Sequence, residues 1–498
     1  KPQKPKTEIH YTPSPNLKAQ LRPYQTEGVK WLLQHHYNGL GACLADDMGL
    51  GKTLQTLALL VHIHDSLPEK ENPLPTSIFD LGKPQKEALK CLIIMPSSLV
   101  FNWYEEIKRF APQLSCTQYV GHDRKAKALR LSNYDIVLSS YPIVLKDAKL
   151  LERYTFRYII LDESQRIKNN NSQIFKTISA LKAEHKISLS GTPIENSLSD
   201  LWAQMQFINP NILGSYSQFN KYFRTEIEKK HNPIALEELK GIISPFLLRR
   251  TKQQVLKDLP DIEEQIAYCS MSEAQEKWYE QEKSKVRNQL LRIDTETDAA
   301  AFKLNAINML TKLRQISNHP KLIDPQSEIP SGKYEEVISH LEQLWRAGQK
   351  TLIFSSFTSH LALYENWCKK EKIKYVSLTG ATPLEARKIA VERFQNDKEV
   401  SFFFISLKAG EVGLNLTAAS YVLLLDPWWN PFTERQAIGR AHRLGQENKV
   451  NVIRFVSRNT LEEKIIRLQQ SKKELSEHLI EEDTLKNEAL EHLEELLQ

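Results

Sequence analysis

The first residues that suit a chemical role form the segment Asp46–Thr53, which spells Asp-Asp-Met-Gly-Leu-Gly-Lys-Thr. An apolar run, Leu40–Ala45, precedes this segment, and a run with helical character, Leu54–Val61, follows it. Strand, glycine turn and helix in this order can cradle a triphosphate, because glycines let backbone N–H groups approach the phosphates. Lys52 would reach the β- and γ-phosphates, and the Thr53 hydroxyl would hold Mg²⁺. The usual signature begins with glycine, so a surface turn is the alternative unless partners occur elsewhere in the chain.

Two adjacent acids supply such a partner. The apolar run Tyr158–Leu161 ends in Asp162 and Glu163. In sheets of this kind, a strand end places its side chains beside the phosphate loop. We therefore assign Asp162 to Mg²⁺ and Glu163 to the attacking water, with an ordinary strand-end turn as the alternative.

Hydroxyl and arginine side chains form two further candidate groups. The stretch Leu189–Pro193 ends a strand with small hydroxyl residues that could sense a γ-phosphate, or it is an ordinary turn. Farther along, Gln436–Gln446 contains Arg440 and Arg443, which are three apart and would share one face if this segment is helical. Such arginines can stabilise transition-state charge in phosphoryl transfer, although a basic surface helix would have the same pattern.

The elements that must position these residues follow from the apolar runs. The runs alternate with longer amphipathic segments in two groups, before about residue 200 and after about residue 350, which indicates α/β structure with parallel sheets covered by helices. The runs are Cys91–Met95, Asp135–Ser139, Tyr158–Leu161, Ile187–Leu189, Thr351–Phe354, Phe402–Ile405, Tyr421–Leu425 and Val450–Val456. Residues 210–330 lack such runs, so we expect a helical insertion there.

Composition narrows the class of protein. A chain of 498 residues with 41% hydrophobic and 26% charged residues suits a globular protein of two or more domains. It has no apolar run of about 18 residues, so no membrane span is expected. The five cysteines are scattered, which argues against a disulfide framework or a zinc site and fits a reducing compartment. The net charge of +6 permits nucleic-acid binding without demonstrating it. Because the chain begins at Lys1, we expect a piece of a longer protein.

Taken in order, the motifs resemble the Swi/Snf-type ATPases, which are double-stranded DNA translocases of helicase superfamily two. The resemblance covers roughly residues 20–470, and Asp426–Pro431 with Gly413–Leu416 are its most specific parts. The matching stretches are Leu21–Gln25, Asp46–Thr53, Ile94–Pro96, Asp162–Glu163, Ser190–Pro193, Phe246–Arg250, Leu313–Gln315, Asn318–Pro320, Ser331–Lys333, Ser406–Leu416, Asp426–Pro431 and Gln436–Gln446.

The resemblance implies an α/β fold of two RecA-like lobes with helical insertions between them. The implied parts are a linker (1–20), a first lobe with the ATP-binding loop and the start of a helical protrusion (21–250), a helical insertion (251–330), a second lobe (331–465) and a charged helical C-terminal segment (466–498).

The resemblance also implies roles for individual residues. Catalysis would use Lys52, Asp162, Glu163, Arg440 and Arg443, with Mg²⁺ held by Thr53 and Asp162. Gln25 would recognise adenine, and ATP would bind Gln25, Asp47, Met48, Gly49, Leu50, Gly51, Lys52, Thr53 and Gln436. DNA would contact Pro96, Ser97, Ser140, Tyr141, Ser356 and Lys408. Coupling between the lobes or to DNA would use Ser190, Thr192, Gly413 and Trp428.

The implied function is a DNA-dependent ATPase that uses ATP and Mg²⁺ to move along double-stranded DNA and remodel protein–DNA complexes without separating the strands. Its partners would be double-stranded DNA and a DNA-bound protein such as a nucleosome or a polymerase, with no membrane. We expect a bacterial, nucleoid-associated cytoplasmic enzyme, with a nuclear protein as the alternative.

Two other functions are weighed against this one. A strand-separating helicase would share the same core, and a nucleic-acid scaffold would use ATP only as a conformational switch.

The chain departs from the family pattern at Ser164–Gln165, where Ala or Gly and then His is usual, and at Gly439, where Asp is common. The Mg²⁺ and water roles survive both departures.

Overall fold

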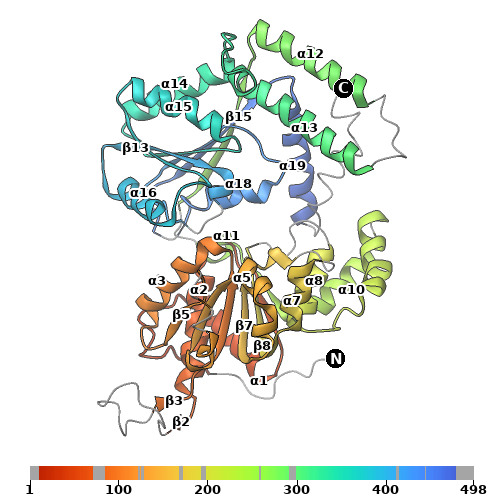
Figure 1. The fold of residues 1–498 in the computed structure, drawn as a ribbon, viewed down its shortest axis with the longest axis vertical. Helices are drawn as coiled ribbons and strands as arrows, with labels where there is room; N and C mark the ends of the chain where they lie inside the picture. Colours follow the sequence, from red (N-terminus) through yellow and green to blue (C-terminus); the bar gives the residue numbers. More distant parts are fainter. Residues whose placement is uncertain are drawn as a thin grey trace. The chain divides into compact units, whose positions relative to one another are not determined.

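The computed structural model describes residues 10–70, 85–121, 124, 128–167, 172–191, 198–230, 232–256, 260–290, 299–410, 414–443 and 445–477. The chain divides into two compact units, Lys1–Lys257 and Asp258–Gln498 (Figure 1). Within the described ranges, no helix has the length and apolar character needed to cross a membrane.

The first unit is built on a seven-stranded parallel sheet with the strand order β5-β6-β4-β7-β8-β1-β9. Its strands are β1 (Ala42–Leu44), β4 (Cys91–Met95), β5 (Cys116–Gln118), β6 (Ile136–Ser140), β7 (Thr155–Asp162), β8 (Lys182–Leu189) and β9 (Leu247–Leu248). A separate antiparallel ribbon pairs β2 (Glu69–Lys70) with β3 (Gln85–Lys86).

The helices of the first unit lie before, between and after these strands. The α-helices are α1 (Pro23–Tyr37), α2 (Lys52–Asp65), α3 (Val100–Phe110), α5 (Tyr141–Lys146), α6 (Ala148–Leu151), α7 (Gln173–Ala180), α8 (Leu198–Ile208), α9 (Tyr216–Phe219), α10 (Pro233–Ile243) and α11 (Lys252–Val255). The others are the 3-10 turns η2 (Ser97–Leu99), η3 (Leu131–Asn133), η4 (Ser164–Ile167) and η6 (Ser244–Phe246), and a π-helix, η5 (Asn220–Lys229).

The second unit contains a six-stranded parallel sheet with the order β10-β15-β14-β11-β13-β12. Its strands are β10 (Ile262–Cys269), β11 (Thr351–Ser355), β12 (Lys374–Leu378), β13 (Val400–Ser406), β14 (Tyr421–Leu424) and β15 (Val450–Ser457). Its helices are α12 (Glu273–Leu290), α13 (Ala299–Asn318), η7 (Pro320–Leu322), α14 (Gly332–Arg346), α15 (Thr358–Lys370), α16 (Leu384–Asn396), α17 (Leu407–Gly410), α18 (Pro431–Ile438) and α19 (Leu461–Glu477).

Strand β13 shows why its sheet is covered on both faces. Its residues alternate between two apolar cores, with Phe403 and Ile405 in one and Phe402 and Phe404 in the other. The first core includes residues of α16 and α18, and the second includes residues of α14 and α15. These two pairs of helices lie on opposite faces of the sheet (Figure 1). A strand buried on both faces must be apolar throughout, which is why it appears in the sequence as a continuous run. The expected α/β class with parallel sheets covered by helices is confirmed.

Residues 210–330, where a helical insertion was expected, also hold two strands that the sequence did not indicate. Strand β9 pairs with β1, and strand β10 pairs in parallel with β15 over its full length. Strand β10 lies at the edge of its sheet and keeps the exposed acids Glu263 and Glu264. A half-exposed edge strand carries charges, so it lacks the apolar run that marks the buried strands.

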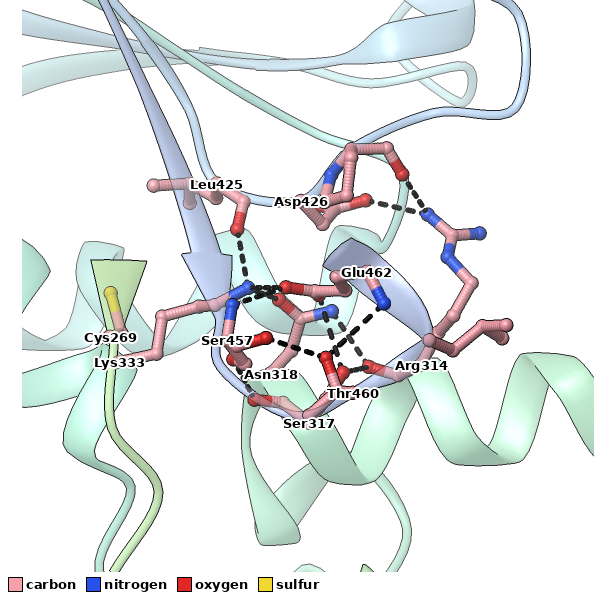
Figure 2. Close-up of polar contacts among 12 residues, drawn as sticks. Cys269, Arg314, Ser317, Asn318, Lys333, Leu425, Asp426, Ser457, Thr460 and Glu462 are labelled. Carbon is pink, nitrogen blue, oxygen red and sulfur yellow. Dashed lines mark hydrogen bonds and ion pairs between the residues drawn. The ribbon is translucent and has the colours of Figure 1, made fainter. Parts of the chain in front are cut away.

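A buried polar network joins four elements of the second unit. The Lys333 ammonium on α14 donates to Glu462 Oε2 at 2.5 Å, to Asn318 Oδ1 at 2.9 Å and to the Leu425 carbonyl at 3.1 Å. Figure 2 shows these groups pointing at one another from α13, α14, α19 and the end of β14. The Glu462 carboxylate also accepts the Ser457 N–H at 2.8 Å. With side-chain exposures of 1% and 0%, the Lys333–Glu462 ion pair fixes the C-terminal helix α19 to the sheet.

An arginine–aspartate pair continues this network toward Trp428. Arg314 Nη2 donates to Asp426 Oδ2 at 3.2 Å and to the Pro427 carbonyl at 2.8 Å. The Arg314 guanidinium also lies over the Trp428 ring, 5.3 Å from the centroid. Burial by itself would raise the pKa of Asp426, but the nearby His360 ring, whose Nδ1 lies 3.9 Å from Asp426 Oδ1, and the Arg314 charge outweigh it and hold that pKa below its usual value. The helix α13 is therefore tied to the segment after β14 by ionised groups.

We predict that breaking the buried pair destabilises the second unit far more than breaking an exposed one. Glu462→Gln leaves the Lys333 charge buried without its counter-ion and should lower the free energy of unfolding by about 3 kcal/mol. The matched control is Glu399→Gln, which breaks the exposed pair with Lys374 and should lower it far less, because water and salt screen exposed charges. Calorimetric unfolding of the intact chain measures both effects. Equal losses in the two variants would contradict this account.

Candidate active site

The expected phosphate loop lies between β1 and α2. Gly49 and Gly51 have φ angles of +90° and +77°, a region that L side chains rarely adopt. A Cβ at Gly51 would also lie 2.5 Å from Gln25 Nε2, so no larger residue fits there. Helix α2 begins at Lys52, directly after Gly51. The N–H groups of its first turn have no intrahelical partners, and the helix dipole favours an anion at this end.

The Lys52 side chain folds back over this loop. Its ammonium donates to the Asp46 carbonyl at 2.5 Å and to the Asp47 carbonyl at 3.4 Å. Burial lowers the pKa of Lys52, while the negative charges of Glu163 and Asp162 act in the opposite direction. A Cβ at Gly191 would lie 3.9 Å from Lys52 Nζ, so the segment after β8 also approaches the loop. The structure thus brings the lysine, the acid pair and the end of β8 together.

The acids Asp162 and Glu163 lie at the carboxyl end of β7. Trp103 Nε1 donates to Asp162 Oδ2 at 2.7 Å, and the Glu163 N–H donates to Asp162 Oδ1 at 2.9 Å. Burial and the neighbouring Glu163 charge raise the pKa of Asp162 to about 7, although the Trp103 bond and the Lys52 charge act to lower it. Glu163 has a φ of +50°, an uncommon conformation for a residue with a side chain. Backbone strain of this kind is found at functional sites.

The two residues after this acid pair connect it to β8 and α8. Gln165 Nε2 donates to Glu163 Oε2 at 2.7 Å, and the Ser190 hydroxyl donates to Gln165 Oε1 at 3.2 Å. Ser164 is fully buried and donates to Gln204 Oε1 at 3.1 Å. Gln165, one of the residues that depart from the family pattern, therefore links Glu163 to Ser190. Sequence reasoning missed this link because residue spacing does not show which side chains meet across strands.

Gln25, the expected adenine-binding residue, lies beside the loop. Its amide N–H donates to the Leu50 carbonyl at 3.1 Å, and its oxygen accepts the Arg22 N–H at 2.9 Å. The side chain is 3% exposed. Its contact with adenine stays a prediction.

Asp46, which takes the place of the usual glycine, has a partner that sequence reasoning missed. Arg250 Nε donates to Asp46 Oδ1 at 2.8 Å, and Arg250 Nη2 donates to Asp46 Oδ2 at 2.5 Å. The two residues are 204 positions apart in the chain. The only signal in the sequence was the family resemblance of Phe246–Arg250, which carries no assignment to the loop.

The two arginines of the second unit differ in their surroundings. Helix α18 ends at Ile438, and the residues from Gly439 to Arg443 form turns and bends, so the two arginines do not lie on a helix. Arg440 is 1% exposed, and its N–H donates to the Ala437 carbonyl at 3.1 Å. Arg443 is partly exposed, and Gln436 lies on α18 with partial exposure. Their roles toward ATP stay predictions.

The expected DNA contacts divide by exposure. Pro96 is partly buried and Ser97 is exposed, at the end of β4 and the start of η2. Ser140 and Tyr141 are 1% and 3% exposed, and the Tyr141 hydroxyl donates to the Asp162 carbonyl at 2.9 Å. This burial contradicts a direct contact between those two side chains and DNA. Tyr141 instead supports the backbone of the acid pair.

The remaining expected residues lie in the second unit or in undescribed segments. The Ser356 hydroxyl donates to Asp426 Oδ2. The Trp428 N–H donates to Glu434 Oε1 at 2.8 Å. Lys408 lies on α17, but its side chain is outside the description, as are Thr192 and Gly413 entirely. Within the described ranges there is no cluster of three or more His, Cys, Asp or Glu side chains that could hold a metal ion by itself.

We predict that Asp162→Asn stabilises the first unit at high pH. Because the native pKa is about 7 and the unfolded value is near 4, the native state keeps a proton that the unfolded chain releases. This residue therefore costs stability as pH rises from about 4 to about 7, and the full cost remains above that range. At pH 8, without Mg²⁺ or nucleotide, the variant should be more stable by on the order of 2 kcal/mol. Unfolding measured at pH 5 and pH 8 tests this, and a difference that does not grow with pH would contradict it.

Known proteins resemble this chain along most of its length. It is 36% identical to YwqA of Bacillus subtilis, whose name describes an ATP-dependent helicase/translocase, over 97% of this chain and 51% of that protein. It is 33% identical to the human SWI/SNF-related matrix-associated actin-dependent regulator of chromatin subfamily A member 1 (96% and 45%), and 32% identical to the ISWI chromatin-remodeling complex ATPase ISW2 of Saccharomyces cerevisiae (97% and 43%). The chain thus spans about half the length of these curated relatives.

Solved structures and family domains were also matched. The SWI2/SNF2 ATPase core of Sulfolobus solfataricus in complex with dsDNA is 38% identical, covers 93% of each chain and has a TM-score of 0.47. Residues 332–445 match the helicase conserved C-terminal domain, and residues 24–322 match the SNF2-related domain. Because the second of these matches covers more than half of the 498 residues, the chain belongs to the SNF2-related family, as its motifs indicated.

Proposed function

We propose that this chain hydrolyses ATP with Mg²⁺ and uses the hydrolysis cycle to move along double-stranded DNA without separating the strands. The observation that carries the proposal is the meeting of Lys52 with Asp162 and Glu163 at one edge of the first sheet. A cation at the start of a helix and two acids at a strand end are the groups that a triphosphate and its metal require. Membership of the SNF2-related family supports the same activity.

The residues present fit a magnesium ion brought by the nucleotide. Asp162 is a carboxylate whose pKa of about 7 reflects removal from water beside another acid, so a divalent cation would favour its charged form. Mg²⁺ is commonly held by one or two protein oxygens together with substrate phosphates, so a larger acidic cluster is not required. Thr53 and Asp162 would be its protein ligands. When bound, the ion neutralises charge on the phosphate oxygens.

The remaining residues of the first unit would orient the reactants. Lys52 would exchange the Asp46 carbonyl for phosphate oxygens, because those oxygens carry more negative charge. Glu163 would hold the attacking water, with Gln165 fixing its carboxylate and Ser190 fixing Gln165. A change at the γ-phosphate would then reach the end of β8 through two hydrogen bonds. This link is the basis for coupling between hydrolysis and conformation.

We further propose that Arg440 and Arg443 stabilise the transition-state charge in the ATP-bound state. Hydrolysis would then require both units, and DNA that favours their productive arrangement would raise the rate. Phosphate contacts carry no sequence information, so binding should be indifferent to sequence and weakened by salt. The names of the relatives ISW2 and YwqA describe a chromatin-remodeling ATPase and a helicase/translocase, which supports DNA as the track.

The DNA-bound protein that the translocase acts on is proposed only as a class, a nucleosome or a polymerase. We place the protein at the bacterial nucleoid, in line with its resemblance to YwqA of Bacillus subtilis.

Displacement of a third DNA strand from a duplex tests translocation directly. Movement along the duplex should release the third strand in an ATP-dependent way, while the two strands of a tailed duplex should stay paired. Glu163→Gln is the blank, because it keeps ATP binding but cannot position water, and it should release no third strand. Unwinding of the tailed duplex would instead support a strand-separating helicase.

We predict that Arg440→Ala removes DNA-stimulated hydrolysis while leaving DNA binding nearly intact. The loss in kcat should be on the order of 10³-fold, as for arginines that stabilise transition-state charge. Arg435→Ala is the matched control, since Arg435 is an exposed residue of α18 to which we assign no role. Thermal unfolding must show that Arg440→Ala folds, because this side chain is buried. Normal hydrolysis by Arg440→Ala would refute the arginine assignment.

A further inference from the structure

The helices between β8 and β9 leave the first sheet and return to it beside the phosphate loop. The segment starts with α8, continues through α9, η5 and α10, and ends at β9, which pairs with β1. We call residues 198–250 the helical excursion. Both of its ends contact elements of the nucleotide site, and the functions proposed above do not account for either contact.

The return end is joined to the loop by side chains. The Arg250 guanidinium forms a two-pronged ion pair with the Asp46 carboxylate, and its Nη2 also donates to Gln55 Oε1 at 2.8 Å. Its Nη1 donates to the Tyr24 carbonyl. The side chain of Asp46 is 0% exposed and that of Arg250 is 12% exposed. A bidentate arginine–carboxylate pair fixes the relative orientation of the two side chains as well as stabilising their contact.

Backbone hydrogen bonds also join the return end to the loop. The Ala45 N–H donates to the Leu248 carbonyl at 2.7 Å, and the Asp47 N–H donates to the Arg250 carbonyl at 2.9 Å. The Lys252 N–H then donates to Asp47 Oδ2 at 3.0 Å. The first two residues of the phosphate loop are thus held on main chain and side chain by the return end.

Helix α1 has a glycine, Gly28, at the point where it approaches the Arg250–Asp46 pair. A Cβ at Gly28 would lie 2.0 Å from Gln55 Oε1 and 2.8 Å from Arg250 Nη2. Any larger residue there would displace both side chains, although glycine is otherwise unfavourable within a helix. The space beside Gly28 therefore serves the Arg250–Asp46–Gln55 group.

The outgoing end is joined to the acid pair. On α8, Gln204 Oε1 accepts from Ser164 at 3.1 Å and from Ser188 at 3.3 Å. One residue after α8, Asn209 Oδ1 accepts the Gly41 N–H at 2.8 Å and its Nδ2 donates to the Gly41 carbonyl at 3.0 Å. Movement of α8 would therefore reach both the strand before the loop and the residue after Glu163.

We propose that Arg250 is a positioning residue for ATP, through which the return end of the helical excursion sets the shape of the phosphate loop. The inference rests on the proposed ATP hydrolysis. Arg250 would act through Asp46, the first residue of the loop, whose buried carboxylate it holds with two hydrogen bonds. The buried Asp46 carboxylate is the group through which Arg250 restrains the loop. This role explains why a charged residue stands where glycine is usual. A ligand that shifts the excursion would alter nucleotide binding.

Steady-state kinetics of Arg250→Ala test this assignment. Loss of the restraint loosens the loop in the ground state and the transition state alike, so KM for ATP should rise about tenfold while kcat changes by less than about twofold. Arg249→Ala is the matched control, because the adjacent arginine is exposed, and its KM should equal that of the parent chain. The KM of Arg250→Lys should fall between those of Arg250→Ala and the parent chain, because lysine supplies the charge but cannot form a bidentate ion pair.

A second variant keeps the test decisive if Arg250→Ala fails to fold. Arg250→Met combined with Asp46→Ala removes both buried charges, so stability should be recovered while the raised KM remains. If KM stays within about twofold of the parent value in the folded variants, or kcat alone falls, Arg250 is merely structural and the inference is overturned. If the parent chain does not bind a fluorescent ATP analogue, the proposed function itself fails.

Discussion

The proposed nucleotide site depends on one constraint of parallel sheets, namely that the carboxyl ends of their strands meet at a single edge. Three strands bring their chemistry to that edge: β1 is followed by the phosphate loop, β7 ends in Asp162, and β8 is followed by Ser190. Since β7, β8 and β1 are adjacent in the sheet, segments more than a hundred residues apart meet at this edge, where the Ser190 N–H donates to the Leu44 carbonyl at 3.2 Å. Burial away from water is the main cause of both the raised pKa of Asp162 and the lowered pKa of Lys52.

The second unit uses buried charge for a different purpose. Its ion pairs Lys333–Glu462 and Arg314–Asp426 join helices from distant parts of the chain to the end of β14. Desolvation of such pairs offsets much of their attraction, so their value lies in fixing one arrangement of the helices. The Arg250–Asp46 pair of the first unit has the same character, but it acts on a loop that must accommodate a ligand. Buried ion pairs in this protein therefore hold helices, and the loop that begins at Asp46, in one arrangement.

The sequence predicted the buried parts of the fold well and the edges poorly. Strand β4 has the bounds that its apolar run, Cys91–Met95, indicated, because a strand covered on both faces must be apolar throughout. Strand β10 was missed because an edge strand keeps charges. Local patterns predicted roles for Lys52 and Asp162, whereas they gave none for Arg250, because its partner lies 204 positions away and only tertiary structure shows the pair. Tyr141 was misplaced for a related reason: a hydroxyl after a strand is equally suited to the surface and to the Asp162 carbonyl.

The central claim is that duplex DNA controls ATP hydrolysis by this chain. The most direct measurement is the rate of ATP hydrolysis with no nucleic acid, with duplex DNA, with single-stranded DNA and with duplex RNA, each at two salt concentrations. The account predicts strong stimulation by duplex DNA that declines as salt rises, because phosphate contacts are electrostatic. Equal rates under all four conditions would contradict it and would show that the nucleotide site does not respond to DNA.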